Sequence, residues 1–362
     1  MRRHGPDLLA ALALLAALPG LWIAPAAFFA AWLAAWWFCL LATMGLLANG
    51  WIHALTGGRW GEALRRVAAP LARRLPWLWL AFLPLAAGMA HVYPWAGAST
   101  AWTRSLDLPA FQLAWFAPAF FWPRVAVYAA LWTLLARPAV FARRGRVAAA
   151  LFAWVASGTL ATVDLVVSLL PGWTSTGHGL VNIAGGALAG TALGVLVLAQ
   201  RLPRAFPTPA PRPARPRVPP VWRDLGNLLL MWTMVWAYLA FVEFLIQWAE
   251  NLPREVAWLV PRLTSGWADV GIALAALAFG GCFVALLFRA NKDHPRRLAR
   301  VAALALAGQL LNCAWLVLPS VDAHGALGWW LVPSLAVAIG LPMASRAWRE
   351  LGGGVAPEAL HA

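Results

Sequence analysis

Long apolar runs, separated by short polar connections, dominate the hydrophobic pattern of this chain. About ten of them approach the ~20 residues with which a helix crosses a bilayer, and they lack the period-two alternation of barrel strands. The predicted spans are residues 7–23, 26–48, 76–93, 112–136, 147–170, 179–200, 225–249, 267–289, 299–318 and 327–348. The pattern therefore predicts an all-α, polytopic integral membrane protein.

Composition identifies lipid as the solvent of these runs. Hydrophobic residues make up 62% of the 362 and charged residues 11%, about half the charged fraction of a soluble domain. Many of the 25 tryptophans lie near the ends of the runs, as interfacial anchors do. The net charge of +15 does not indicate nucleic-acid binding, because the basic residues lie between the apolar runs and not on one soluble face.

Basic residues alternate between the connections. Of the 28 lysines and arginines, all but Arg104, Arg124, Arg254 and Arg262 lie in the two terminal tails or in every second connection. With ten spans, the positive-inside rule then places both termini in the cytoplasm. The first run also resembles a signal peptide, but a second span follows at once and the charge pattern requires both, so we expect it to be retained.

A segment rich in proline and arginine, residues 201–224, divides the chain into a six-span part (1–200) and a four-span part (225–362). Its proline density predicts a stiff, extended cytoplasmic linker. In the sixth span Gly186, Gly190 and Gly194 recur every four residues, which predicts the close approach of a neighbouring helix. The basic connections either set topology alone or also attract anionic lipid headgroups.

Ionisable side chains inside the apolar runs are the candidates for function, because a charge in hydrocarbon costs several kcal/mol unless it is paired or hydrated. Asp164 lies near the outer end of the fifth span, and Glu243 lies at a similar depth in the seventh. His91 and Tyr93 end the third span on the same side. Arg124 lies deeper in the fourth span, where it could meet either carboxylate.

Two interpretations of these residues remain open. In the first, an outer-side site passes protons or adjoins a quinone headgroup; its residues are Asp164, Arg124, Glu243, His91, Tyr93 and His178. In the second, Arg124 and one carboxylate form a buried ion pair that sets helix register. His91 and Tyr93 then bond only to headgroups or backbone at the interface.

Motifs of soluble enzymes are absent from the chain. It has no phosphate-binding glycine loop, no zinc-protease motif and no serine elbow, so we expect no catalytic residues. Cys39, Cys282 and Cys313 lie in apolar runs without the spacing of a metal, haem or iron–sulfur site. We therefore predict buried, unpaired thiols, no bound metal and no directly bound cofactor.

Several segments, taken in order, resemble a known family. They are residues 53–61, 120–128, 164–176, 236–238, 251–256 with Trp258 and Arg262, and 266–267. Together they resemble the ActF-type membrane subunit of alternative complex III, also called quinol:cytochrome c oxidoreductase quinone-binding subunit 2. That subunit belongs to the NrfD-like, polysulfide-reductase-type superfamily. The resemblance extends from about His53 to Pro319.

The resemblance implies about ten spans in two four-helix bundles plus extra helices, in a bacterial inner membrane. It implies a subunit of a quinol-oxidising complex that is not catalytic alone and contributes a proton path. Expected partners are a multihaem cytochrome, an iron–sulfur protein and a second NrfD-like subunit, which carry the haem and iron–sulfur clusters. Quinone or quinol is the one ligand that this subunit itself could meet.

The chain departs from the family pattern at the fifth-to-sixth turn. Leu165 follows Asp164 where the family has Trp, Leu170 stands where a Glu is expected, and Gly172 replaces a His. Glu243 stands where a Ser-Gln pair is common, and it could supply the missing acid group. Two alternatives therefore stay open: a stand-alone membrane transporter and a purely structural subunit.

Overall fold

The computed structural model describes residues 5–58, 60–201, 220–322 and 327–351, and regular structure in these ranges is helical throughout. The all-α prediction is confirmed for this part of the chain. Most of the predicted linker, residues 202–219, lies outside the described residues.

Helices of the part before the linker follow one another closely. The α-helices are α1 (Gly5–Ala17), α2 (Pro19–Ile23), α3 (Pro25–Thr56), α4 (Trp60–Ala72), α5 (Leu75–Leu80), α6 (Pro84–Val92), α7 (Pro109–Phe116), α8 (Pro118–Leu135), α9 (Arg144–Leu165) and α10 (His178–Arg201). Short 3-10 helices stand between them: η1 (Pro94–Ala96), η2 (Ala101–Ser105), η3 (Pro138–Ala142) and η4 (Val167–Leu169).

The part after the linker contains both long and short helices. They are α11 (Pro220–Glu250), η6 (Val256–Trp258), α12 (Val260–Leu263), α13 (Trp267–Ala276), the π-helix η7 (Leu277–Val284), α14 (Ala285–Leu287), α15 (Arg289–Lys292), α16 (Pro295–Val321) and α17 (Gly328–Leu351).

Eight helices of the described part are long and apolar enough to cross a membrane. The predicted spans 76–93 and 112–136 are not among them, because each is interrupted. The first breaks between α5 and α6, ahead of Pro84, which has no N–H for the helix ladder. The second breaks at Ala117, whose backbone is extended as is usual before a proline. The protein is thus a multi-pass membrane protein with eight such helices.

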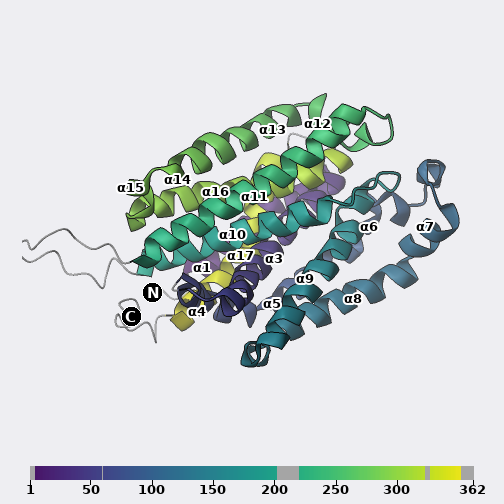
Figure 1. Cartoon of the computed structure of the whole chain (residues 1–362). Helices are drawn as coiled ribbons and strands as arrows, with labels where there is room; N and C mark the ends of the chain where they lie inside the picture. The colour runs from purple at the N-terminus through teal and green to yellow at the C-terminus, as the bar shows by residue number, and fades with distance from the viewer. Residues whose placement is uncertain (1–4, 59, 202–219, 323–326, 352–362) are drawn as a thin grey trace, which may run out of the picture.

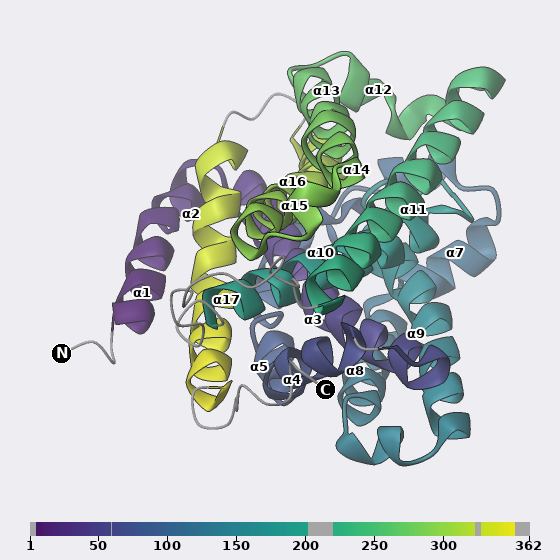
Figure 2. The same ribbon diagram turned by 60° about the vertical axis from the view of Figure 1, so that its left-hand side comes forward.

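Helix α3 is the axis of the molecule (Figures 1 and 2). It packs against α4, α9, α10, α16 and α17, and 89% of its apolar window is buried. By contrast, only 17% of the corresponding window is buried in the first helix and in α11. One buried core therefore includes helices from both sides of the linker.

The closest helix approach in the core is between α3 and α10. A Cβ built on Gly45 would lie 1.9 Å from the carbonyl oxygen of Gly186, and one on Gly190 would lie 2.1 Å from the backbone nitrogen of Leu46. The predicted close approach at the Gly186–Gly190 repeat is confirmed, and α3 is the partner helix. Any side chain at these positions would force the two backbones apart.

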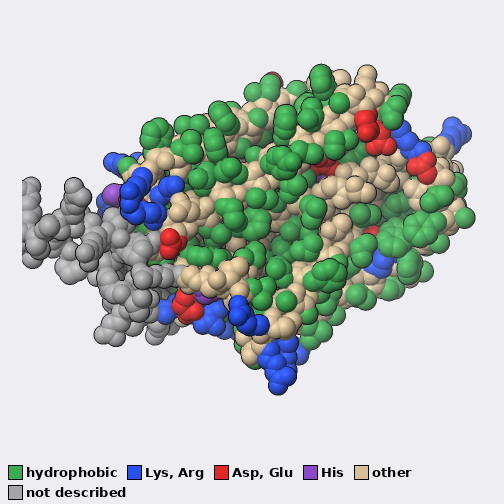
Figure 3. All heavy atoms as spheres, viewed as in Figure 1, with side chains coloured by type: hydrophobic (Ala, Val, Ile, Leu, Met, Phe, Trp, Pro, Cys, Tyr) green, Lys and Arg blue, Asp and Glu red, His purple; other side chains and the backbone are tan. Residues whose placement is uncertain are grey.

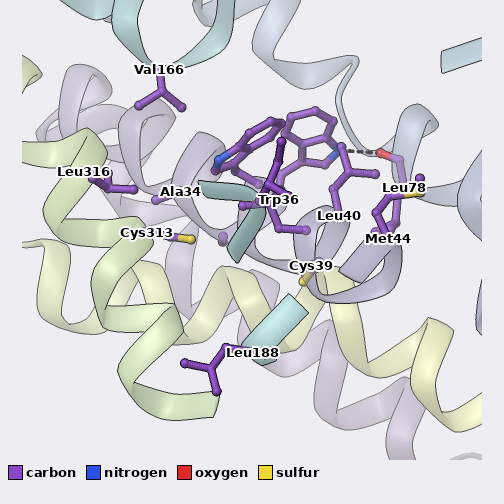
Figure 4. Close-up of a cluster of buried hydrophobic side chains, with 14 of the residues drawn as sticks. Ala34, Trp36, Cys39, Leu40, Met44, Leu78, Val166, Leu188, Cys313 and Leu316 are labelled. Atoms are coloured by element: carbon purple, nitrogen blue, oxygen red, sulfur yellow. Dashed lines mark hydrogen bonds between the residues drawn. The ribbon is translucent and has the colours of Figure 1, made fainter. Parts of the chain in front are cut away.

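Tryptophans of α3 compensate for the break between α5 and α6. The Nε1–H of Trp36 donates to the carbonyl oxygen of Leu78 at 2.6 Å, and that of Trp32 donates to the carbonyl oxygen of Ala81 at 2.8 Å. Figure 4 shows the bond from Trp36 among the buried side chains that surround it. Because no water is present in hydrocarbon, carbonyls freed by a helix break need such donors from protein.

The outer surface is apolar over its middle. Figure 3 shows hydrophobic side chains covering this face, with Lys and Arg gathered mainly toward the end near α4 and α15. Trp22, Phe152 and Ile272 are 74%, 76% and 68% exposed in the isolated chain. Apolar surface of this extent is typical of helices that contact lipid or other membrane subunits.

Candidate functional site

A buried carboxylate, Asp164, lies in the last turn of α9 and is 0% exposed. Its Oδ1 accepts hydrogen bonds from Nε1 of Trp115 (2.8 Å) and Nη2 of Arg124 (3.0 Å). Its Oδ2 accepts from Nε of Arg124 (2.9 Å) and the hydroxyl of Tyr128 (2.7 Å). These donors come from α7 and α8, so one side chain ties three helices together.

The geometry at Asp164 is that of a structural ion pair. Arg124 binds both carboxylate oxygens, a bidentate arrangement that is strong and specific in orientation, and its guanidinium lies 4.1 Å from the centroid of the Trp115 ring. Each carboxylate oxygen has two hydrogen-bond donors, and one of the donor groups is a guanidinium, so all four contacts fix the orientation of this side chain. The expected pairing of Arg124 with a carboxylate is present, and Asp164, not Glu243, is that carboxylate.

Tyr93 lies beside this cluster, whereas His91 lies outside it. The Tyr93 hydroxyl is buried and donates to the carbonyl oxygen of Leu165 at 3.0 Å. His91 is exposed and stacks on the ring of Phe29, with centroids 5.9 Å apart and planes at 6°. The structure therefore does not place His91 with the other residues of the site predicted from sequence.

Glu243 of α11 forms a second, separate cluster with the start of α10. Its carboxylate accepts a hydrogen bond from the Ser175 hydroxyl at 2.5 Å and lies 3.0 Å and 3.1 Å from Nδ1 of His178. The His178 side chain is 0% exposed and that of Glu243 is 11% exposed. The partner of this carboxylate is thus an imidazole, a side chain that can act as a proton shuttle, whereas the partner of Asp164 is a guanidinium.

The other ring nitrogen of His178 is unsatisfied. Nε2 is buried and has no hydrogen-bond partner among the described residues. Trp173 and Trp258 pack edge-on against the imidazole, with centroids 5.4 Å and 5.3 Å away. The imidazole therefore has one nitrogen on a carboxylate and one free for a water or a ligand, as a proton-passing group requires.

Glu243 is joined to the turn in which the family acid is missing. It bonds to Ser175 and His178, which follow Leu170 closely in the chain. Trp173, in the same turn, stacks on Trp258 with centroids 5.1 Å apart. A carboxylate is thus present next to this turn although Leu170 cannot supply one.

Arg262 of α12 is a buried cation that the sequence interpretation left without a role. Its side chain is 0% exposed and its guanidinium lies 3.6 Å from the centroid of the Trp258 ring. Nε donates to the carbonyl oxygen of Trp315 at 3.0 Å. That carbonyl lacks its usual intrahelical donor, because the residue four positions later is Pro319. Arg262 thus completes the hydrogen bonding of a proline-interrupted helix end.

A small enclosed cavity lies between α10, α11, η7 and α16. Its volume is about 10 Å³, room for about one water molecule. The Gln309 side chain lines it, is 3% exposed and has no hydrogen-bond partner among the described residues. Gly185 makes room for that amide, since a Cβ there would lie 2.6 Å from Gln309 Oε1. The π-helix η7 forms another wall, and π-helical turns are frequent at functional sites.

Several members of these clusters carry only weak signals in the sequence. Tyr128 lies four residues after Arg124 and so shares its helix face, a relation that helix periodicity could have found. Arg262 and Pro319 are individually visible as an isolated cation and a proline directly after a predicted span. Trp115 resembles many other tryptophans, so nothing in the sequence marks it, whereas Ser175 lies in the segment 164–176 that the sequence singled out.

The three cysteines are buried and unpaired, as predicted. In the part of the chain that the structure describes, no three His, Cys, Asp or Glu side chains are grouped so as to hold a metal ion.

An ion pair lies at the opposite end of α11. Arg223 donates from Nε and Nη2 to the two oxygens of Asp293, at 2.8 Å and 2.7 Å. These hydrogen bonds hold the pKa of Asp293 below its ordinary value. The pair links the start of α11 to the connection before α16.

No protein-family model matches the chain, and no curated protein matches it.

Proposed function

We propose that this protein is an integral membrane subunit of a quinol-oxidising respiratory complex similar to alternative complex III. In this proposal it crosses a bacterial inner membrane ten times, in two four-helix bundles plus extra helices, with both termini in the cytoplasm. It works with a multihaem cytochrome, an iron–sulfur protein and a second NrfD-like subunit. Glu243 and His178 form part of a proton path, and no bond to substrate is made or broken by this chain alone.

One observation carries the proposal: the enclosed hydrogen-bonded contact between Glu243 and His178. Titratable side chains inside a membrane protein are costly, and they commonly mark the path of an ion or proton. Here the imidazole is entirely buried and retains one free nitrogen, while the carboxylate is slightly exposed. A proton could therefore enter at Glu243 and leave through Nε2 of His178.

The Asp164 cluster supports a structural role instead. Its carboxylate has four donors and a permanently charged partner, so protonation would break several hydrogen bonds at once. Of the residues predicted for the proton path, Glu243 and His178 thus remain in the proposal. Arg124, Asp164 and Tyr93 hold the helices beside it.

The test is proton movement in the purified complex. The complex is isolated from its native membrane through a tag on this chain, reconstituted into vesicles and supplied with quinol and an electron acceptor. We expect haem- and iron–sulfur-containing partners to co-purify. Glu243→Gln and His178→Gln should slow proton movement across the vesicle membrane on the order of tenfold or more, with haem content unchanged.

Glu250→Gln is the matched control, because Glu250 is an exposed acid on the same helix. It should leave proton movement unchanged. Normal proton movement in Glu243→Gln would reject the path and support a purely structural subunit. Isolation of a solitary protein that carries a substrate across vesicles would reject the complex and support a transporter.

The transporter alternative has one structural point against it. Discontinuous helices of transporters use unwound backbone carbonyls to coordinate ions. At the break between α5 and α6, however, the carbonyls of Leu78 and Ala81 already accept hydrogen bonds from Trp36 and Trp32. These two carbonyls are therefore already hydrogen-bonded, which counts against an ion site at this break.

A further inference from the structure

An open apolar groove of about 640 Å³ lies between α5 and α8 on the outside of the molecule. Three aromatic side chains line it: the rings of Trp79 and Phe82 lie 6.5 Å apart, and those of Phe82 and Trp122 lie 5.9 Å apart. The groove is separate from the polar clusters described above, and none of their members lines it.

The shape of the groove follows from the sequence of α8. Ala126, Ala130 and Thr133 line it and recur at spacings of four and three, so they share one face of the helix. Small side chains along this face leave a channel beside α5, which is only six residues long. The groove is thus a consequence of small residues on α8 opposite a short, broken helix.

Arg137 lies at one end of this face and also lines the groove. Its side chain is exposed and makes no hydrogen bond or ion pair with any residue that the structure describes. The connection that follows carries Arg143, Arg144 and Arg146, which are exposed as well. An apolar channel with a free guanidinium at its end is complementary to an amphipathic molecule with an anionic head.

The length of the groove matches one leaflet of a bilayer. From Ala126 to Arg137 the chain rises about 16 Å at ~1.5 Å per residue, close to half of the ~30 Å hydrocarbon thickness. A phosphate bound at Arg137 would therefore lie at headgroup depth, with an acyl chain extending toward the middle of the membrane. Guanidinium binds phosphate oxygens in a bidentate manner.

We propose that this groove binds one anionic phospholipid, with its phosphodiester at Arg137 and one acyl chain along Ala126 and Ala130. The free guanidinium of Arg137 favours a net-negative headgroup over a zwitterionic one, whose ammonium it repels. The site does not depend on the proton path, so it can be tested apart from it.

The experiment measures lipid retention by the full-length protein. The protein is purified in detergent, incubated with equimolar phosphatidylglycerol and phosphatidylethanolamine, and analysed by native mass spectrometry. We expect one phosphatidylglycerol to remain bound in preference to phosphatidylethanolamine. Arg137→Ala should lower its retention about fivefold, as loss of one basic contact near a membrane surface implies.

Two further variants separate the groove from general charge attraction. Ala130→Phe fills the channel but keeps Arg137, and it should also lower retention; a site for free phosphate alone would be unaffected. Val127→Phe is its control, because Val127 is 60% exposed on the same helix and does not line the groove. Arg143→Ala is the control for charge and should change retention little.

Equal retention of the two lipids, or equal losses in Arg137→Ala and Arg143→Ala, would overturn the proposal. Unchanged retention in Ala130→Phe would do the same. If a protein subunit co-purifies on this face and retained lipid is absent from the complex, the groove is a subunit contact instead. Thermal unfolding of each variant verifies that it is folded.

Discussion

The carboxylates of Asp164 and Glu243 are paired with different kinds of side chain, and this difference distinguishes their roles. Asp164 contacts a guanidinium, which stays charged at any physiological pH. Glu243 contacts the imidazole of His178, a side chain type that can donate and accept protons. A residue type and its depth in the membrane are therefore insufficient to assign function. The partner side chain decides whether the acid is an anchor or an exchangeable group.

The anchor role of Asp164 gives a prediction on stability. Asp164→Asn removes the countercharge of Arg124, whose side chain is only 12% exposed. Breaking a buried pair by removing one member costs about 3–5 kcal/mol, so the variant should unfold at a clearly lower temperature in detergent. The double change Asp164→Asn with Arg124→Gln should recover part of the loss, because no unpaired charge remains.

The control for this change is Asp269→Asn, at an exposed acid in the first turn of α13. It should shift the melting temperature only slightly. If Asp164→Asn melts together with this control, the four hydrogen bonds at Asp164 contribute nothing to stability and the anchor role is wrong.

At the scale of elements, interrupted helices in this molecule are completed by donors from other helices. Indoles of α3 bond to the carbonyls at the break between α5 and α6. The guanidinium of Arg262 bonds to the carbonyl that Pro319 leaves free in α16. In each case the donor is distant in sequence. A helix break within the membrane therefore involves two elements: the broken helix, and a second helix whose side chains hydrogen-bond to the freed backbone groups. These groups must be satisfied by protein, because hydrocarbon cannot do so.

This rule predicts a difference between two buried tryptophans of α3. Trp36→Phe removes the donor to Leu78, whereas Trp51→Phe removes an indole N–H that has no partner. Both side chains are 0% exposed, so both changes delete similar buried volume. Leaving a buried carbonyl unsatisfied costs about 1–3 kcal/mol, and Trp36→Phe should be less stable than Trp51→Phe by that amount.

Thermal unfolding of the two variants in the same detergent measures this difference. A Trp51→Phe protein that is as unstable as Trp36→Phe would mean that packing alone, and not the hydrogen bond, supports the helix break.

At the scale of the whole molecule, one core holds the chain together on both sides of the linker. α10, which precedes the linker, packs against α11 and α16, which follow it. α1 packs against α17, so the first and last described helices are neighbours (Figure 2). The contact of α3 with α10 is the tightest part of this core, because glycines let the backbones meet.

Gly190→Ala should therefore destabilise the whole fold. The added Cβ would meet backbone atoms of Gly45 and Leu46 at 2.1–2.7 Å, and a backbone cannot move aside as a side chain can. We expect a loss of monodisperse protein in size-exclusion chromatography. Gly308→Ala is the control: it lies in a helix with nothing within 4 Å of the new Cβ, and it should be neutral or stabilising by up to about 1 kcal/mol. Equal yields of the two variants would contradict the role of the close approach.

The sequence alone indicated that lipid surrounds the helices and that the fold is all-α. It also indicated that another helix approaches closely at Gly186 and Gly190. These are properties of single segments, namely length, hydrophobicity and spacing, and they do not depend on neighbours. It also offered an ion pair of Arg124 with one carboxylate as one of two interpretations. It could not choose between Asp164 and Glu243, because that choice depends on how α8, α9 and α11 are rotated against one another.

Only the tertiary structure decided the remaining points. It separated the two acids into different clusters, placed His91 outside both, and paired Arg262 with a carbonyl that Pro319 had left free. It also showed that two predicted spans are interrupted. Hydropathy averaged over a window of residues does not indicate whether another helix supplies hydrogen-bond donors at a helix break. The physical reason is common to these cases. Contacts between helices depend on packing across the bundle, and the periodicity of one segment carries no information about its neighbour.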